Sequence, residues 1–162
     1  MGILFYLIYQ LYLYQIFFMK IPSKTVFYHI ERTIKTYRKF SRQNFLKVVD
    51  NITIDQKLIL QYLNDHPELN QNEIAELVFK DNASLTRMID LMVQKGFLQR
   101  SINPNDRRKF KIELTRKGKE GLEKLAPIIV ENRKKAFAGI SEEELTQLKQ
   151  TLNKIVSNLN KN

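Results

Sequence analysis

The stretch LTRMIDLMVQKGFLQR, residues 85–100, contains two different periodicities in succession. Its apolar residues recur at the spacing i, i+3, i+4, i+7 and i+8, which is typical of one face of an amphipathic helix: Leu85, Met88, Ile89, Met92 and Val93. Gly96 favours the end of that helix, because glycine readily adopts the left-handed conformation of a C-terminal cap. The sequence therefore predicts a helix from about Ala83 to Lys95.

After Gly96 the apolar residues change to the two-residue period of β-strands. Residues 97–102 predict one strand, and NPNDRRKFKIELTRKGKE, residues 103–120, contains a second in which Phe110, Ile112 and Leu114 alternate with polar residues. Residues 103–108 have the composition of a turn, with a basic tip. A β-hairpin is therefore expected directly after the helix.

Capping and periodicity predict five further helices. Two of them begin at Thr53 and Asn70, where Gln56 and Glu73 complete capping boxes. The other three are an amphipathic helix from Thr25 to about Leu46, a helix from Arg116 to about Ala138, and a helix that opens at Ser141 with Glu144. The fold class is mainly α with a small β-hairpin wing (α+β), a winged helix-turn-helix.

The expected organisation is a winged helix-turn-helix at residues 52–115, flanked by dimerisation helices at 20–51 and 116–162. In the last helix, apolar residues spaced 3, 4, 3, 4 form a seam that is typical of a helix packed lengthwise on another: Leu145, Leu148, Leu152, Ile155 and Leu159. An intramolecular bundle would satisfy that pattern. A homodimer is favoured, because the flanking helices need a partner outside the middle domain.

The positive charge is concentrated in two short stretches. The chain has 162 residues and a formal net charge of +10, and it contains no cysteine. Residues 20–47 carry eight Lys or Arg against one acid, and residues 100–119 carry eight against two. Focused charge of this kind indicates an anionic partner, such as nucleic acid or an anionic membrane surface.

The sequence offers no chemistry for catalysis or for metal binding. It contains two histidines, His29 and His66, and no arrangement of them suggests a metal site or a catalytic triad. A nucleophile–base pair and a glycine-rich phosphate loop are also lacking. We therefore expect a protein that is not an enzyme and that has no cofactor.

The helix at residues 83–95 is the candidate recognition helix for double-stranded DNA. A recognition helix places short polar side chains and arginine near its N-terminus in the major groove, with its opposite face on the core. Ser84, Thr86 and Arg87 match that requirement. Taken alone, the same residues would be interpreted as an ordinary solvated helix face.

The hairpin tip strengthens the DNA-binding hypothesis. It contains Arg107, Arg108 and Lys109, and arginine is attracted into a narrow minor groove by its negative potential. Asp106 is expected to pair with Arg108 and to orient its guanidinium. The alternative is an exposed ion pair of little energetic value.

These two stretches together resemble the MarR (multiple antibiotic resistance regulator) family of bacterial winged-helix repressors. The pattern Asp106-x-Arg108 followed by Ile112-x-Leu114-Thr115-x-x-Gly118 is similar to that family's wing signature. SEEELTQL, residues 141–148, is similar to its last helix. The resemblance covers about residues 52–120 well, and the flanking helices by pattern.

The resemblance implies a cytoplasmic homodimer that represses transcription at a roughly palindromic operator and is released by a small aromatic or phenolic effector. In the family the effector pocket usually lies between the dimerisation region and the DNA-binding domain. His29, Tyr37, Phe40 and Tyr62 could line it, but each is interpreted here as a core residue. A winged-helix protein-interaction module and a membrane-tethered regulator stay open as alternatives.

Residues 1–19 form an apolar N-terminal extension, interrupted by Gln10 and Gln15. It can be interpreted as a start-site artefact that precedes a native Met19, as a membrane anchor, or as an extra interface helix. The artefact is favoured because four tyrosines lie within the stretch, whereas tyrosine prefers membrane interfaces. No stable membrane association is therefore expected.

Overall fold

A computed structural model describes residues 6–10, 22–49, 52–103 and 106–161, with the backbone alone at Pro22 and residues 102–110. Met19 and most of the apolar extension lie outside the described residues. The elements follow one another in the order η1 (Pro22–Lys24), α2 (Val26–Phe45), α3 (Ile54–Asp65), α4 (Gln71–Leu77), α5 (Asn82–Gln94), β1 (Leu98–Asn103), β2 (Asp106–Leu114), α6 (Arg116–Ala136) and α7 (Glu142–Leu159).

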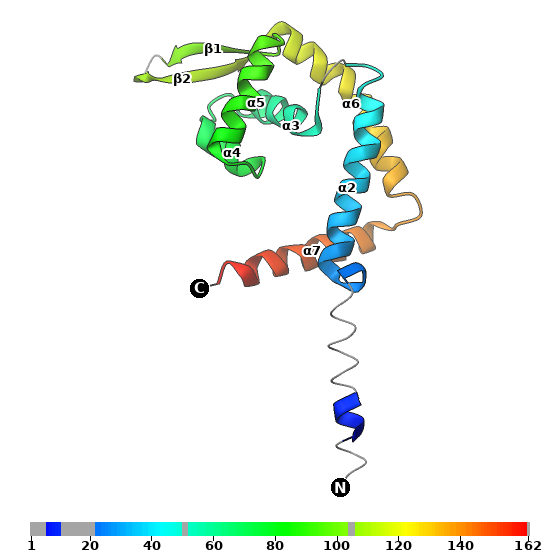
Figure 1. Ribbon diagram of the computed structural model, residues 1–162. Helices are drawn as coiled ribbons and strands as arrows, with labels where there is room; N and C mark the ends of the chain where they lie inside the picture. Colours follow the sequence, from blue (N-terminus) through cyan, green and yellow to red (C-terminus); the bar gives the residue numbers. More distant parts are fainter. Residues whose placement is uncertain (1–5, 11–21, 50–51, 104–105, 162) are drawn as a thin grey trace.

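The middle of the chain folds as the predicted winged helix-turn-helix (Figure 1). Both predicted capping boxes are formed, at Thr53 for α3 and at Asn70 for α4. The apolar stripe of α5 lies in the core, as its spacing predicts. The core of this region contains several fully buried side chains, Ile59, Leu60, Ile74, Leu85, Ile89 and Met92.

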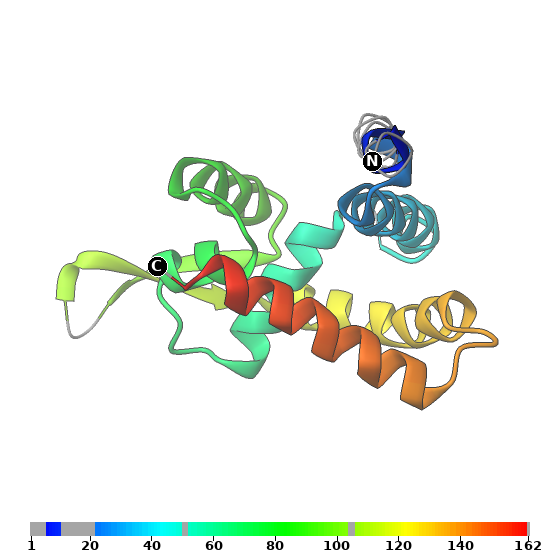
Figure 2. The same cartoon turned by 90° about the horizontal axis from the view of Figure 1, so that it is seen from below.

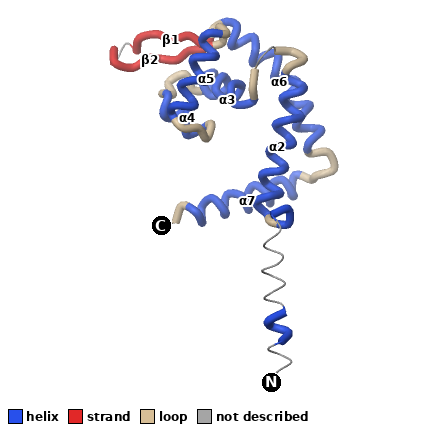
Figure 3. Tube along the Cα trace, in the orientation of Figure 1, coloured by secondary structure: helices blue, strands red, loops and turns tan. Residues whose placement is uncertain are grey.

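Two of the flanking helices, α2 and α6, share this core. Helices α2 and α6 lie side by side, as Figures 1 and 3 show, and they pack against each other. Phe45 of α2 and Leu125 of α6 are buried in the same apolar cluster as the winged domain. Helix α7 leaves the end of α6 and extends below the winged domain (Figures 1 and 2), and none of its residues is buried.

The hairpin differs from the sequence prediction at its tip. We expected residues 103–108 to form the turn, but β2 begins at Asp106, and Asn103 is paired with Asp106 in the register. Residues 106–108 were therefore wrongly assigned to the loop. The pairing at the tip is irregular: the register shifts between Ile102 and Asn103, so that residues 107–109 have no partner residue in it. Turn composition alone does not signal such an irregular extension of the strand.

The root of the hairpin is held by Phe97, Thr115 and Gly118. The backbone N–H of Thr115 donates to the carbonyl oxygen of Phe97 at 3.1 Å, and the Thr115 hydroxyl donates to the carbonyl of Gly96 at 2.6 Å. The same hydroxyl accepts from the Gly118 N–H at 3.1 Å and so caps α6. A Cβ at Gly118 would lie 2.3 Å from the Phe97 carbonyl oxygen, so only glycine fits there.

Two glycines of α6 allow a matched test of this close approach. Gly118→Ala forces backbone apart from backbone, and we expect it to lower the free energy of unfolding by about 1–3 kcal/mol. At Gly121 a Cβ would meet the Phe97 ring at 3.5 Å, an ordinary contact. Gly121→Ala should therefore be neutral or stabilising by up to about 1 kcal/mol, through helix propensity. Urea unfolding of both variants measures the difference, and equal losses would contradict this account.

Candidate nucleic-acid interface

The N-terminus of the recognition helix α5 is fixed by Asp81. Its carboxylate accepts from the Ser84 N–H and from the Ser84 hydroxyl, both at 2.7 Å. These bonds hold the pKa of Asp81 below its usual value, first through the backbone N–H and then through the hydroxyl. The predicted DNA-contacting residue Ser84 is thus part of the helix cap. A hydroxyl that already donates keeps only acceptor capacity, which a base amino group can use and a phosphate cannot.

The Thr86 hydroxyl also forms hydrogen bonds within the domain, one of them with Gln71, which the sequence did not indicate. This hydroxyl donates to the carbonyl oxygen of Asn82 at 2.7 Å and accepts from Nε2 of Gln71. Gln71 is the first residue of α4, so the bond ties the two helices of the helix-turn-helix together. Because the partners are 15 residues apart on different helices, no local pattern signals the contact. Gln71 joins Thr86 on the candidate DNA-binding face.

Arg87 is an accessible cation on this face. It is exposed, and it makes no ion pair with another residue that the structure describes. One turn further on, Asp90 is paired with Arg100 of β1 at 2.6 Å. That ion pair offsets the negative charge of Asp90 and joins the recognition helix to the hairpin.

The hairpin projects from the body as a separate arm (Figures 1 and 2). Asp106, Arg107, Arg108 and Lys109 lie in its second strand, near the tip. Their side chains fall outside what the structure describes, so the expected pairing of Asp106 with Arg108 stays a prediction. Closer to the root, Lys111 pairs with Glu113 at 2.8 Å, and this lowers the pKa of Glu113 through the hydrogen bond and the positive charge.

An ion-pair network connects the helix-turn-helix to α2. The carboxylate of Asp55, at the start of α3, is paired with Arg38 of α2 and with Lys80, which lies 3.4 Å away in the turn before α5. The Asp55 side chain is only 14% exposed, so these contacts are partly shielded from water. The orientation of the recognition helix is therefore coupled to α2.

The junction of α2, α3 and α6 contains a polar layer. Lys57 is 8% exposed, and its pKa is lowered by burial and by the nearby positive charge of Arg133. Asn44 donates to Asn132 Oδ1 at 2.7 Å, whereas the buried Ser41 hydroxyl lacks a hydrogen-bond partner among the described residues. The flanking helices therefore meet the winged domain through polar as well as apolar contacts.

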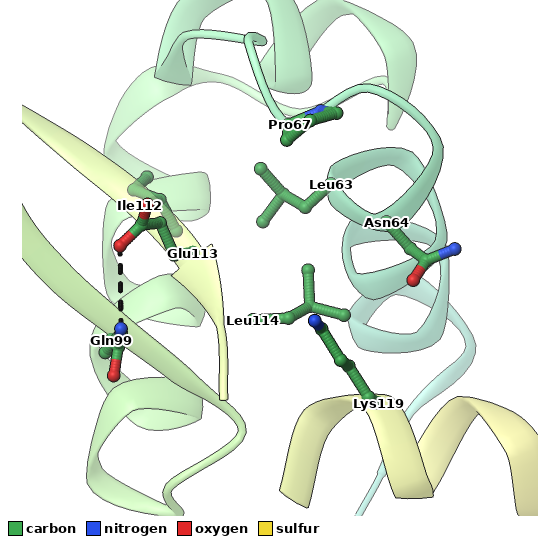
Figure 4. A pocket seen from close by; sticks show the side chains of 8 residues that line it. All are labelled: Leu63, Asn64, Pro67, Gln99, Ile112, Glu113, Leu114 and Lys119. Atoms are coloured by element: carbon green, nitrogen blue, oxygen red, sulfur yellow. Dashed lines mark hydrogen bonds between the residues drawn. The ribbon is translucent and has the colours of Figure 1, made fainter. Parts of the chain in front are cut away.

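A hollow of about 400 Å³ lies at the hairpin root, between α3, β2 and the start of α6 (Figure 4). Leu63 and Leu114 face each other across it, and the Lys119 amino group points towards Leu114. The remaining lining residues are Asn64, Pro67, Gln99, Ile112 and Glu113.

The four residues considered for an effector pocket are not brought together at this hollow. None of them lines it. His29 is exposed, so its interpretation as a core residue is wrong, whereas Tyr37, Phe40 and Tyr62 are partly buried. The His29 ring lies edge-on to the Tyr28 ring, and the Lys135 amino group lies over the Phe40 ring. Tyr62 lines a separate surface hollow.

The part of the chain that the structure describes contains neither a metal-binding cluster nor a membrane-spanning helix. Among residues 6–10, 22–49, 52–103 and 106–161 there is no group of three or more His, Asp or Glu side chains that could hold a metal ion. None of the described helices combines the length and apolarity that crossing a bilayer requires. The anchor interpretation of residues 1–19 concerns mainly residues outside these ranges.

The cap of α5 gives a pH-dependent prediction. Because the folded-state pKa of Asp81 is lowered, its ionised form stabilises the folded protein above the usual aspartate pKa of about 4. That stabilisation disappears as the pH falls through the lowered pKa. Asp81→Asn keeps a capping oxygen but does not titrate. We expect wild type to lose more thermal stability than Asp81→Asn between about pH 5 and pH 3; identical losses would contradict the role of Asp81.

A family model and a curated relative both match this chain and agree on the class of protein. The model of the MarR family matches residues 52–110. The uncharacterized HTH-type transcriptional regulator YkoM of Bacillus subtilis is 31% identical over 128 residues, which cover 74% of this chain and 82% of YkoM.

Two solved structures are similar over most of the chain. The MepR–DNA complex of S. aureus is 26% identical with a TM-score of 0.74, and the match covers 83% of this chain and 96% of MepR. A variant of E. coli MarR in complex with operator DNA has a TM-score of 0.75 at 23% identity, over 86% of this chain and 96% of that one. At that identity the second likeness shows the fold alone.

Proposed function

Because the chain belongs to the MarR family of transcriptional regulators, we propose that it binds an operator in double-stranded DNA as a homodimer. It is a regulator and not an enzyme. One observation supports the DNA contact above all. The recognition helix α5 and the basic hairpin are joined by the Asp90–Arg100 ion pair, so that Arg87 and the hairpin tip are held by one framework.

The proposed division of roles follows from the chemistry of each residue. Arg87 contacts a base or a phosphate in the major groove, with Ser84 and the Thr86–Gln71 pair beside it. Arg107, Arg108 and Lys109 contact the backbone and the minor groove, with Asp106 orienting Arg108.

The dimer is proposed from apolar surface that a single chain leaves exposed. In α2, Val26 and Phe27 are 65% and 64% exposed, and in α7 Leu148 and Leu159 are 53% and 72% exposed. A second copy is the simplest cover for both helices, and a two-fold dimer matches a palindromic operator. The structure of MepR, which is 26% identical to this chain, is a complex with DNA.

Regulation completes the proposal. We infer a cytoplasmic repressor that a small aromatic or phenolic effector releases from DNA, as the family membership suggests. Selection of bound sequences from random double-stranded DNA tests the proposed function directly. Enrichment of a palindromic sequence is the expected result, and failure to enrich any sequence at physiological salt would reject it.

The dimer is tested with paired substitutions in α7. Leu148→Glu with Leu152→Glu places two carboxylates in the apolar seam, and each would cost several kcal/mol if it stayed buried. We expect sedimentation to show monomers and operator affinity to fall, because two half-sites are no longer bound together.

The matched control adds the same charge to the opposite side of α7. Gln150 and Asn153 are exposed and lie away from the seam, so Gln150→Glu with Asn153→Glu should remain dimeric. A dimer that tolerates charges in the seam would refute the assignment of α7.

The two DNA-contacting elements should differ in what they contribute. If Arg87 bonds a guanine bidentately, Arg87→Ala should cost about 1–3 kcal/mol at one base position and relax the choice of base there. Arg108→Ala should weaken binding to every sequence and reduce the salt slope by about one unit. Binding titrations on the selected operator and on single-base variants measure both effects.

Asp106→Ala distinguishes the orienting effect of Asp106 on Arg108 from the effect of net charge on DNA binding. The substitution adds net positive charge, so a model based on charge alone predicts tighter binding. We expect weaker binding, because Arg108 loses its orienting partner. Tighter operator binding by Asp106→Ala would refute the pairing.

A further inference from the structure

A second surface hollow lies on the winged domain and contains none of the proposed DNA-contacting residues. It has a volume of about 500 Å³ and is formed by α3, the α3–α4 loop, α4 and the turn that leads to α5. Its apolar lining consists of Tyr62, Leu69, Leu77 and Phe79, and its two acidic residues are Glu73 and Glu76.

Phe79 makes this surface unusual, because its conformation and its exposure are both unfavourable. Its φ is 56°, in the left-handed region that suits glycine. Its side chain is 92% exposed, so little apolar burial compensates for the backbone strain. The folded monomer therefore gains almost nothing from a phenyl ring at this position.

The acidic residues determine which partner fits. Residues 58–79 contain Asp65, Glu68, Glu73 and Glu76 but no Lys or Arg, although the chain as a whole carries +10. Glu73 uses one carboxylate oxygen to accept the Asn70 N–H in the α4 cap. Glu76 is exposed and forms no ion pair with another described residue. Carboxylate oxygens of Glu73 and Glu76 are thus available to pair with a cation of a partner.

These charges disfavour the two partners already proposed, DNA and a second copy of the chain. DNA phosphates would be repelled by Glu73 and Glu76. A second copy docked symmetrically through the same hollow would bring these carboxylates face to face with their own counterparts, which is destabilising. The hollow instead complements a cationic partner.

We propose that this hollow, lined by Tyr62, Leu69, Leu77 and Phe79 and flanked by Glu73 and Glu76, docks a basic amphipathic helix of another protein. Apolar side chains at i, i+3 and i+4 of that helix enter the hollow beside the Phe79 ring. Lys or Arg side chains next to them pair with Glu73 and Glu76. The contact is small and transient, and it is additional to DNA binding and dimerisation.

The experiment uses the full chain and three labelled helical peptides of about five turns. The first has a Leu face flanked by Lys, the second has the same Leu face flanked by Glu, and the third has Lys without a Leu face. The chain carries +10, so it repels a Lys-rich peptide overall, and binding of the first peptide reports the local acidic surface. We expect the first peptide to bind at least about tenfold more tightly than either of the others.

Substitutions in the chain then test whether the peptide binds at the hollow. Phe79→Gly keeps the left-handed turn and should fold at least as stably as wild type. It should nevertheless lower the affinity for the first peptide by about tenfold. Glu76→Lys should lower the affinity for the first peptide to a similar extent. Glu123→Lys, on the exposed surface of α6, is the matched control and should leave that affinity unchanged.

Affinity for the selected operator should stay within about twofold in Phe79→Gly. Equal binding of the Lys and Glu peptides, unchanged peptide binding in both hollow variants, or a larger loss of operator affinity would each overturn the proposal. The last outcome would instead assign Phe79 to DNA, and a shift to higher oligomers in wild type alone would assign the hollow to a second copy.

Discussion

The carbonyl group of Phe97 is the point on which the arrangement of the DNA-binding surface depends. It accepts from the Thr115 backbone at the end of β2, and Gly118 of α6 packs directly against it. One peptide unit therefore fixes the start of β1, the end of β2 and the first turn of α6. Any side chain at position 118 would separate the hairpin from the helix that leads to the flanking region.

The other long-range contacts extend this framework in two directions. The Asp90–Arg100 ion pair connects the hairpin to α5, and the Thr86–Gln71 bond connects α5 to α4. The Arg38–Asp55–Lys80 network then connects the turn before α5 to α2. Charged and polar contacts thus link the proposed DNA-contacting elements to the proposed dimerisation helices, while the apolar core supplies the shared interior.

Local patterns in the sequence predicted the fold well, whereas contacts between distant residues escaped it. The capping boxes at Thr53, Asn70 and Ser141 need partners only three residues away, and all three are formed. The Gln71–Thr86 bond depends on how two helices pack. The hairpin tip was wrongly predicted because the strand continues there through an irregular pairing, with a register shift between Ile102 and Asn103, which the turn composition of the side chains does not signal.

Helix α6 runs without interruption from Arg116 to Ala136, through Pro127, and it belongs to both halves of the molecule. An α-helix advances about 1.5 Å and turns about 100° for each residue. A single inserted residue between Gly121 and the end of α6 would therefore swing the following dimerisation surface around the helix axis before it lengthened the molecule appreciably. The length of α6 thus sets how far α7 lies from the winged domain, and its helical phase sets the direction in which α7 leaves it.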